Sequence, residues 1–435
     1  MATASQLRAG AAAADITPPI GVTLAGSLTR REAASVLDPL HARCVVLESG
    51  GTRIAFVLLE LIALDNADTA RVREVVARAG GMPVENVCVS CVHTHTGPCT
   101  LTFFQSEREA AFVAAMTAHC GDAARLAVKN MKPARAAWGN GWEPRAAFNR
   151  RYHMRDGTLK TNPGYANPQV IRPAGPTDPQ IPILLIESTA GEPIAVIANF
   201  SLHYIGDHDM RAISADYFGC FARIMQERKG KQFVALLTHG ASGDINNVDV
   251  FHKPGPRQPQ EQSNRVAGWV ADQVDAVWSK ATFQAGVPVG ATQSIYNERI
   301  RKPKGAEIEE ARKQSEDAKL PLLDRLYAKE QLELLKWPEE VPMVIQALRV
   351  GDWGAGTSPG EIFCRFGLDL KNASPFPVTA LIELANGYGG YIPTRVDYEL
   401  GGYETRLARS AFAAPFTGEE MVAVAAMGLR KLFKG

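Results

Sequence analysis

The chain has 435 residues, with 47 basic and 46 acidic side chains and a formal net charge of +1 at pH 7. Hydrophobic residues make up 46% and charged residues 21%, a balance typical of a globular protein with a large core. No basic stripe with interleaved aromatic residues indicates a nucleic-acid surface, and the longest apolar run, residues 54–64, is shorter than the roughly 18 residues of a membrane span. We therefore expect a small-molecule substrate as the partner, no nucleic acid and no membrane, and the composition is compatible with a homo-oligomer.

The amino-terminal residues 1–14 are rich in alanine but lack the basic stretch and leucine-rich segment of a secretion signal. The seven cysteines are an odd number, and they lie in apolar segments. This favours free thiols in a reducing compartment. Together these features predict a cytoplasmic protein.

Strand and helix patterns alternate along the first 280 residues. Short apolar segments bounded by Gly, Pro or Asp predict strands at residues 42–48, 53–61, 86–92, 136–142, 182–187, 194–200 and 233–238. Apolar residues at helical spacing predict helices at residues 67–79, 107–131, 215–229 and 260–281. Residues 162–180 and 251–260 are expected to be loops, because they are rich in Pro, Gly and polar residues.

The carboxy-terminal third begins with a charged amphipathic stretch at residues 306–337, which predicts one or two helices with a solvated face. Further strands are expected at residues 341–350, 353–357 and 377–385, followed by a helix at residues 417–433. The alternation predicts an α/β fold. Because no shift in composition marks a boundary, we expect residues 1–435 to form a single domain.

A histidine pair follows the strand expected at residues 86–92. His93 and His95 are two apart, so in an extended chain both side chains point to the same side. Gly97 and Pro98 then end the strand. Such a pair suits a metal or an acid–base site, although a non-catalytic His-x-His explains the pattern about as well.

Two further polar clusters follow apolar strands. His203 comes just after residues 194–200, so it is expected to face the same crevice as His93, since ligand sites gather at strand ends in α/β sheets. Asp244 lies in a run of small residues, 238–247, and could orient a histidine; a tight turn satisfied by Asp and Asn is the alternative. His208 is expected to be a loop histidine rather than a ligand.

Other residues carry weaker signals. Glu361 follows an expected strand and, on this signal alone, is expected to be a surface carboxylate. Residues 386–394 are rich in Gly and Tyr, which predicts a loop with packed tyrosines. Cys88 and Cys91 are three apart, so on a strand they face opposite sides. We therefore interpret both as core residues and not as zinc ligands.

In their order along the chain, several segments resemble motifs of the catalytic domain of the neutral/alkaline ceramidases. They span nearly the whole sequence, and their joint order is more specific than any one of them. The segments are Ala-Asp-Ile-Thr-Pro-Pro-Ile-Gly at 14–21, Leu-His-Ala-Arg at 40–43, His-Thr-His-Thr-Gly-Pro at 93–98, Asn-Arg at 149–150, Ile-Ser-Ala-Asp-Tyr at 213–217, Gly-Glu-Ile-Phe at 360–363 and Tyr-Ile-Pro-Thr at 391–394.

This resemblance implies mixed β-sheets flanked by helices and a Zn²⁺ ion held by two histidines, a glutamate and a tyrosine. Carried over to this chain, the ligands are His93, His203, Glu361 and Tyr391. The remaining expected site residues lie around the ion. His95 handles a proton or binds the substrate, Arg150 binds or polarises a substrate oxygen, Asp244 orients a ligand, and the substrate is contacted by Asn149, Asn246 and Tyr388.

Three departures change the expected substrate. Asn246 stands where the family has the serine of a Gly-Asp-Val-Ser-Pro-Asn segment, and Asn cannot act as a hydroxyl nucleophile. The sequence also ends at Gly435 without the family's carboxy-terminal sandwich domain, and it shows no secretion signal. We therefore expect a soluble small or medium-sized substrate rather than a lipid.

The expected activity is that of a zinc-dependent hydrolase acting on an amide bond, or on an ester or lactone, through metal-activated water, whose pKa is about 7 at such sites. Two alternatives remain at this stage. One is a catalytically inactive metal-binding protein on the same scaffold, suggested by Asn246. The other is a zinc lyase or isomerase acting on a small polar, sugar-like molecule.

Overall fold

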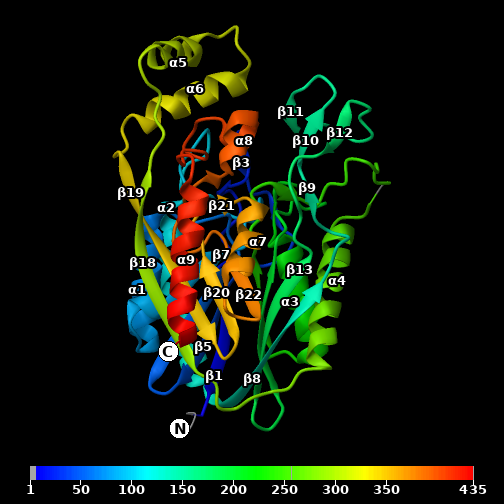
Figure 1. Ribbon diagram of the computed structural model, residues 1–435, viewed down its shortest axis with the longest axis vertical. Helices are drawn as coiled ribbons and strands as arrows, with labels where there is room; N and C mark the ends of the chain where they lie inside the picture. The colour runs from blue at the N-terminus through cyan, green and yellow to red at the C-terminus, as the bar shows by residue number, and fades with distance from the viewer. Residues whose placement is uncertain (1–5, 256, 435) are drawn as a thin grey trace.

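The computed structural model describes residues 6–255 and 257–434. Its main element is an eight-stranded mixed sheet in the order β16-β14-β13-β8-β1-β5-β6-β7, and beside it lies a four-stranded sheet in the order β18-β19-β20-β22 (Figure 1). Helices cover the outer faces of both sheets. This confirms the predicted α/β class with mixed sheets flanked by helices. The strands of the two sheets are β1 (Arg8–Asp15), β5 (His41–Ser49), β6 (Thr52–Leu59), β7 (Val87–Cys91), β8 (Lys132–Trp142), β13 (Gln180–Ser188), β14 (Pro193–Phe200), β16 (Val234–His239), β18 (Val289–Arg299), β19 (Glu340–Val350), β20 (Trp353–Thr357) and β22 (Val378–Ile382).

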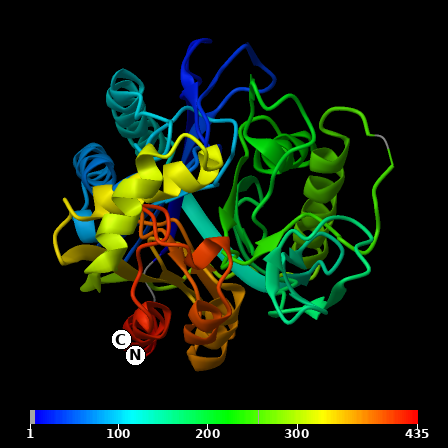
Figure 2. The same ribbon diagram turned by 90° about the horizontal axis from the view of Figure 1, so that it is seen from above.

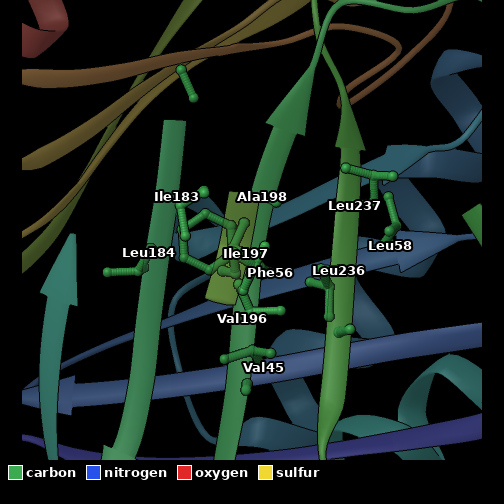
Figure 3. Close-up of a cluster of buried hydrophobic side chains, with 14 of the residues drawn as sticks. Val45, Phe56, Leu58, Ile183, Leu184, Val196, Ile197, Ala198, Leu236 and Leu237 are labelled. Atoms are coloured by element: carbon green, nitrogen blue, oxygen red, sulfur yellow. The ribbon is translucent and has the colours of Figure 1, made fainter. Parts of the chain in front are cut away.

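The large sheet folds over on itself, so that its two halves face each other across the main core. The halves are joined through a short pairing of β1 with β8, at Arg8 with Pro133 and Ala9 with Lys132. Figure 3 shows strands of one half crossing those of the other, with apolar side chains between them. The labelled side chains come from β5 and β6 on one side and from β13, β14 and β16 on the other: Val45, Phe56, Leu58, Ile183, Leu184, Val196, Ile197, Ala198, Leu236 and Leu237.

Strand β5 shows why the sheet is buried on both faces. Val45 and Leu47 point into the core between the two halves, whereas Cys44 and Val46 belong to a second core on the opposite face. This alternation follows from the two-residue period of a strand. The second core is closed by α1 (Asn66–Gly80) and α2 (Ala110–Lys129), and α3 (Asp216–Lys229) and α4 (Glu261–Trp278) cover the other half of the sheet (Figure 2).

The four-stranded sheet packs against α7 (Cys364–Ala373) and α9 (Thr417–Lys434), which form a third core. The charged stretch forms two helices, α5 (Ala306–Glu316) and α6 (Leu322–Leu334), which project as a hairpin at one end of the molecule (Figure 1). The remaining elements are short. They are β2 (Thr23–Leu24), β3 (Arg31–Glu32), β4 (Ser35–Val36), β9 (Phe148–Asn149), β10 (Arg151–Met154), β11 (Leu159–Thr161), β12 (Val170–Pro173), β15 (Ala212–Ile213), β17 (Ile245–Asn246), β21 (Glu361–Ile362), β23 (Tyr391–Ile392), α8 (Arg395–Leu400) and the 3₁₀ turns η1 (Val84–Asn86) and η2 (Tyr403–Thr405).

Several elements were not predicted, among them β1, β18 and α7, and the expected loop at residues 162–180 was only partly right. Strand β18 and helix α7 gave no sequence prediction, and β12 lies inside that loop, where it pairs with β10. Strand β1 is the central strand of the large sheet, although its alanine run favours a helix. Small residues are required there because α2 packs close: a Cβ on Gly10 would lie 2.1 Å from the Ala127 carbonyl oxygen.

The structure also bears on the expectations about membranes and thiols. Of the helices in the part of the chain that is described, none combines the length and apolar character needed to cross a bilayer. All seven cysteines are buried and free. Cys88 and Cys91 lie in different cores, on opposite faces of β7, which confirms their interpretation as core residues.

Candidate metal centre

The candidate site forms where several strands end together. Strands β14 and β16 run parallel and lead to His203 and His239, and β7, which runs parallel to β6, leads to His93. The two-residue strands β21 and β23 pair in parallel, which places Glu361 opposite Tyr391. Residues far apart in the sequence therefore meet at one edge of the sheets, as is usual for ligand sites in α/β proteins.

His93 and His95 approach each other through a turn and not through an extended strand. His93 has a left-handed backbone, with φ of 67°, so the expectation that both side chains share one face of a strand was wrong about the backbone. Their rings nevertheless meet, with centroids 5.0 Å apart. The Nδ1 atoms lie 2.9 Å and 3.2 Å from the carbonyl oxygens of Ile62 and Gly26. A carbonyl can only accept, so Nδ1 carries the proton in both rings and each Nε2 offers a lone pair.

Three imidazoles and one carboxylate converge in this place. His95 Nε2 lies 2.9 Å from His203 Nε2. Glu361 Oε2 lies 3.3 Å from His93 Nε2 and 3.7 Å from His203 Nδ1. The nitrogens of His93, His95 and His203 lie within 4.8 Å of one another, so this cluster could hold a metal ion. Within the described residues, Glu361 Oε2 is buried and makes no hydrogen bond, which is the expected state of an oxygen oriented toward a cation.

The electrostatics keep Glu361 charged and His95 neutral. Burial by itself would raise the pKa of Glu361, but His93, Tyr391 and Arg150 outweigh it and lower that pKa to about 2. Burial and the neighbouring His93 lower the pKa of His95 to about 3. Burial, His93 and Arg150 lower the pKa of His203 well below its ordinary value. His95 and His203 are thus neutral next to a carboxylate, the protonation state that cation ligands require, whereas Glu361 outweighs burial and raises the pKa of His93, whose proton a cation would displace.

Arg150 is held rigidly at the side of the cluster. Its Nε donates to Glu404 Oε1 at 3.0 Å and its NH2 donates to the Gly243 carbonyl at 2.6 Å. The guanidinium lies over the rings of Tyr391 and Tyr403, 5.3 Å from each centroid. The remaining nitrogen, NH1, lies 3.3 Å from His203 Nδ1 and faces the site, where it can bind a substrate oxygen.

Asp244, Asn149 and Asn246 lie behind the site and not in it. The Asp244 carboxylate accepts from the Asn149 amide and from the Cys364 N–H, both at 2.7 Å, so it does not orient a histidine as expected. Its carbonyl oxygen accepts from the Arg150 N–H at 2.8 Å. These residues support Arg150 through the backbone. Burial raises the pKa of Asp244 to about 7.

A cavity of about 310 Å³ opens onto the histidines. Phe103, Phe104 and Tyr327 supply much of its wall, together with Tyr388, whose hydroxyl donates to Glu361 Oε1 at 3.3 Å. Arg150, His95, Glu361 and Tyr391 also line it, whereas Asn149 and Asn246 do not. Asn246 donates instead to Asn162, which is itself part of the wall. Neither of these two expected substrate contacts therefore lies on the cavity wall.

Four residues that shape this site were not predicted from the sequence. Tyr403 contacts the Tyr391 hydroxyl, and Glu404 pairs with Arg150. His239 and Glu383 form a buried pair behind His93. His239 at least ends a buried strand, which is the signal that drew attention to His203. His208 is in a loop as expected, but its side chain is buried, 3.6 Å from Asp216.

Comparison with solved structures identifies the fold as ceramidase-like. The neutral ceramidase from Pseudomonas aeruginosa matches with a TM-score of 0.76 and 18% identity, covering 98% of this chain and 75% of that chain. A ceramidase complexed with C2 matches with a TM-score of 0.73 and 18% identity, covering 98% and 76%. A scan against protein-family models and a search of curated proteins find no match.

Proposed function

We propose that this protein is a zinc-dependent hydrolase that cleaves an amide bond, or an ester or lactone, in a small or medium-sized substrate. The observation that carries the proposal is the buried Glu361 oxygen without a hydrogen-bond partner among the described residues, placed between His93 and His203. The ceramidase-like fold supports it, since ceramidases by name act on an amide, the ceramide bond. At 18% identity, that substrate is not carried over.

The residues at the cavity fit a zinc ion. His93, His203, Glu361 and Tyr391 would hold it, because imidazole, carboxylate and phenolate oxygen are all suitable donors and all four line one cavity. When bound, such an ion polarises a carbonyl and lowers the pKa of water to about 7. Burial and the nearby Glu361 raise the pKa of Tyr391, so this hydroxyl keeps its proton unless a cation takes its place.

His95 would transfer protons, and Arg150 would stabilise the charge that develops during the reaction. The His95 Nδ1 proton is engaged by the Gly26 carbonyl, so the lone pair of Nε2, which lies 2.9 Å from His203 Nε2, would take a proton from water and return it to the leaving nitrogen or oxygen once His203 is held by the metal. Arg150 NH1, 3.3 Å from His203 Nδ1, would stabilise the negative charge that develops on the former carbonyl oxygen. Because Glu404 and Gly243 fix the guanidinium beforehand, little reorganisation is needed during the reaction.

The cavity walls favour a substrate with an apolar group beside the scissile bond. Phe103 and Tyr388 stack with ring centroids 5.9 Å apart, and with Leu101 they also line a second cavity of about 450 Å³. The two arginines of that second cavity already pair with carboxylates, Arg108 with Asp68 and Arg409 with Glu330. An uncharged apolar extension therefore suits this space better than an acidic one.

The test combines metal analysis with a hydrolysis screen on amide, ester and lactone substrates of graded apolar length, with His93→Ala as the blank. We expect stoichiometric zinc in the wild type, turnover that depends on it, and incorporation of one oxygen atom from labelled water into the product. Stoichiometric zinc without any turnover would favour the inactive metal-binding protein. Products without solvent oxygen would favour a lyase or isomerase, for which the aromatic walls provide little support.

A further inference from the structure

Glu383 lies at the junction of the two large sheets, just after β22, where it accepts three hydrogen bonds and pairs with His239. Its Oε1 accepts from the Ser242 hydroxyl at 2.7 Å and lies 2.5 Å from His239 Nδ1. Its Oε2 accepts from the backbone N–H groups of Ile362 at 2.9 Å and Ser242 at 3.2 Å. The Glu383 N–H in turn donates to the His239 carbonyl. Glu383 is 1% exposed and His239 is 0% exposed, so all of these contacts are shielded from water.

This arrangement is not a nucleophilic triad, although it contains a serine, a histidine and a glutamate. In such a triad the hydroxyl and the carboxylate bind opposite nitrogens of the imidazole. Here Ser242 and Glu383 both meet His239 at Nδ1, and Nε2 has no hydrogen-bond partner among the described residues. None of the three lines the cavity, so a substrate cannot reach them. Their role must be exerted through neighbouring residues.

Two such neighbours are central to the site. Ile362 follows Glu361 directly, so the bond from its N–H to Glu383 fixes the short strand β21 and with it the Glu361 carboxylate. Ser242 begins the turn whose Gly243 carbonyl accepts from Arg150 NH2. Gly243 N–H also donates to the Ile362 carbonyl, which closes the connection between turn and strand.

His239 supports the same geometry from behind. Its ring stacks on Phe218 with centroids 5.7 Å apart, and it lies 5.8 Å from the ring of His93 and 6.2 Å from that of His203. The buried pair of Glu383 and His239 thus contacts the strand that carries Glu361 and the turn that binds Arg150. Its imidazole also lies behind the rings of His93 and His203.

We propose that Glu383, held by His239, is a positioning residue that fixes Glu361 and Arg150 relative to each other. This inference rests on the proposed function, because Glu361 is taken there as a metal ligand. Outer residues that orient metal ligands typically contribute about 10–100-fold to metal affinity. Loss of Glu383 should therefore weaken metal binding by that factor and, through Arg150, also raise KM.

The test uses the full-length protein with Glu383→Gln, in which the side-chain NH2 group replaces one of the two accepting oxygens and cannot accept a hydrogen bond. Metal affinity is measured by chelator competition with Zn²⁺, and the ligand field by the visible spectrum of the Co²⁺-loaded protein. We expect a Zn²⁺ affinity about 10–100-fold lower and a changed Co²⁺ spectrum. Glu143→Gln is the matched control: Glu143 is equally buried and pairs with Arg145, but lies outside the cavity.

If Glu383→Gln does not fold, His239→Phe is the second variant. It keeps a ring against Phe218 and removes the Nδ1 donor together with Nε2, which has no hydrogen-bond partner among the described residues, and the same changes in Zn²⁺ affinity and Co²⁺ spectrum are expected to be smaller. Wild-type protein that binds no zinc would overturn the proposed function. Wild-type protein that binds zinc, together with variants whose affinity and Co²⁺ spectrum match those of Glu143→Gln, would overturn this inference alone.

Discussion

The role of His95 can be tested by comparing two variants that each remove one donor, His95→Gln and Glu361→Gln. Two tetrahedral zinc ligands at the usual distance of about 2.0–2.1 Å lie roughly 3.4 Å apart. Glu361 Oε2 lies 3.3 Å from His93 Nε2 and 3.7 Å from His203 Nδ1, close to that separation. His95 Nε2 and His203 Nε2 are 2.9 Å apart, the length of an ordinary hydrogen bond. These distances favour Glu361 as the ligand and His95 as the proton carrier.

On this reasoning His95→Gln should keep its metal affinity within about threefold and lose about 10²–10⁴-fold in kcat, the usual contribution of a positioned acid–base group. That loss corresponds to about 3–5 kcal/mol of activation free energy. Glu361→Gln should lose about 100-fold or more in metal affinity, because a neutral amide is a far weaker ligand than a carboxylate. Chelator competition measures the affinities and single-turnover hydrolysis the rates. If His95→Gln lost the metal as severely as Glu361→Gln, His95 would be a ligand and the reasoning would fail.

Two further predictions concern the outer cavity and a buried carboxyl. Ala67 is exposed and lines the 450 Å³ cavity. Ala67→Trp should leave kcat/KM for short substrates unchanged but lower it for long apolar ones, with a loss of about 0.8 kcal/mol in transition-state binding for each methylene group displaced. An equal loss of kcat/KM for both lengths would refute this prediction. Burial raises the pKa of Glu298 from 4.5 to about 8. Between pH 4.5 and about pH 8 the folded protein binds more protons than the unfolded chain. The free energy of unfolding of the wild type should therefore fall, relative to that of Glu298→Gln, by up to about 1.4 kcal/mol per pH unit as the pH rises. Parallel profiles of Tm against pH from about pH 5 to 8 would contradict this.

The part of the site that could be predicted is the part that follows buried strands. His93 and His203 come directly after apolar segments, and the rule that ligands gather at strand ends placed them together. Glu361 and Tyr391 could be found only by resemblance. They lie in two-residue strands whose pairing depends on the whole intervening chain, and two residues carry no periodic signal.

Glu383 and His239 show why the rest of the site could not be predicted. Their positions in the sequence differ by more than a hundred residues, and each follows or ends an ordinary apolar strand. The contact exists because β16 of one sheet and β22 of the other end side by side, a fact of tertiary packing. Strand β1 is the corresponding case in the fold, since the close approach of α2 at Gly10 requires small residues there whatever their strand propensity.

The position of Asn246 changes what its substitution can mean. The sequence suggested that a nucleophilic serine had been replaced, but Asn246 is 2% exposed and donates to Asn162 at 2.7 Å, and it is Asn162 that lines the cavity. A serine at this place would be shorter and still separated from the histidines. Asn246→Ser should therefore leave kcat unchanged within about threefold and cost about 1–3 kcal/mol of stability, because it breaks a buried hydrogen bond. Rapid-mixing kinetics and intact-mass spectrometry test this. A burst of the first product, or an acyl adduct on the variant, would show that position 246 does reach the substrate and that attack by water is not the only route this fold allows.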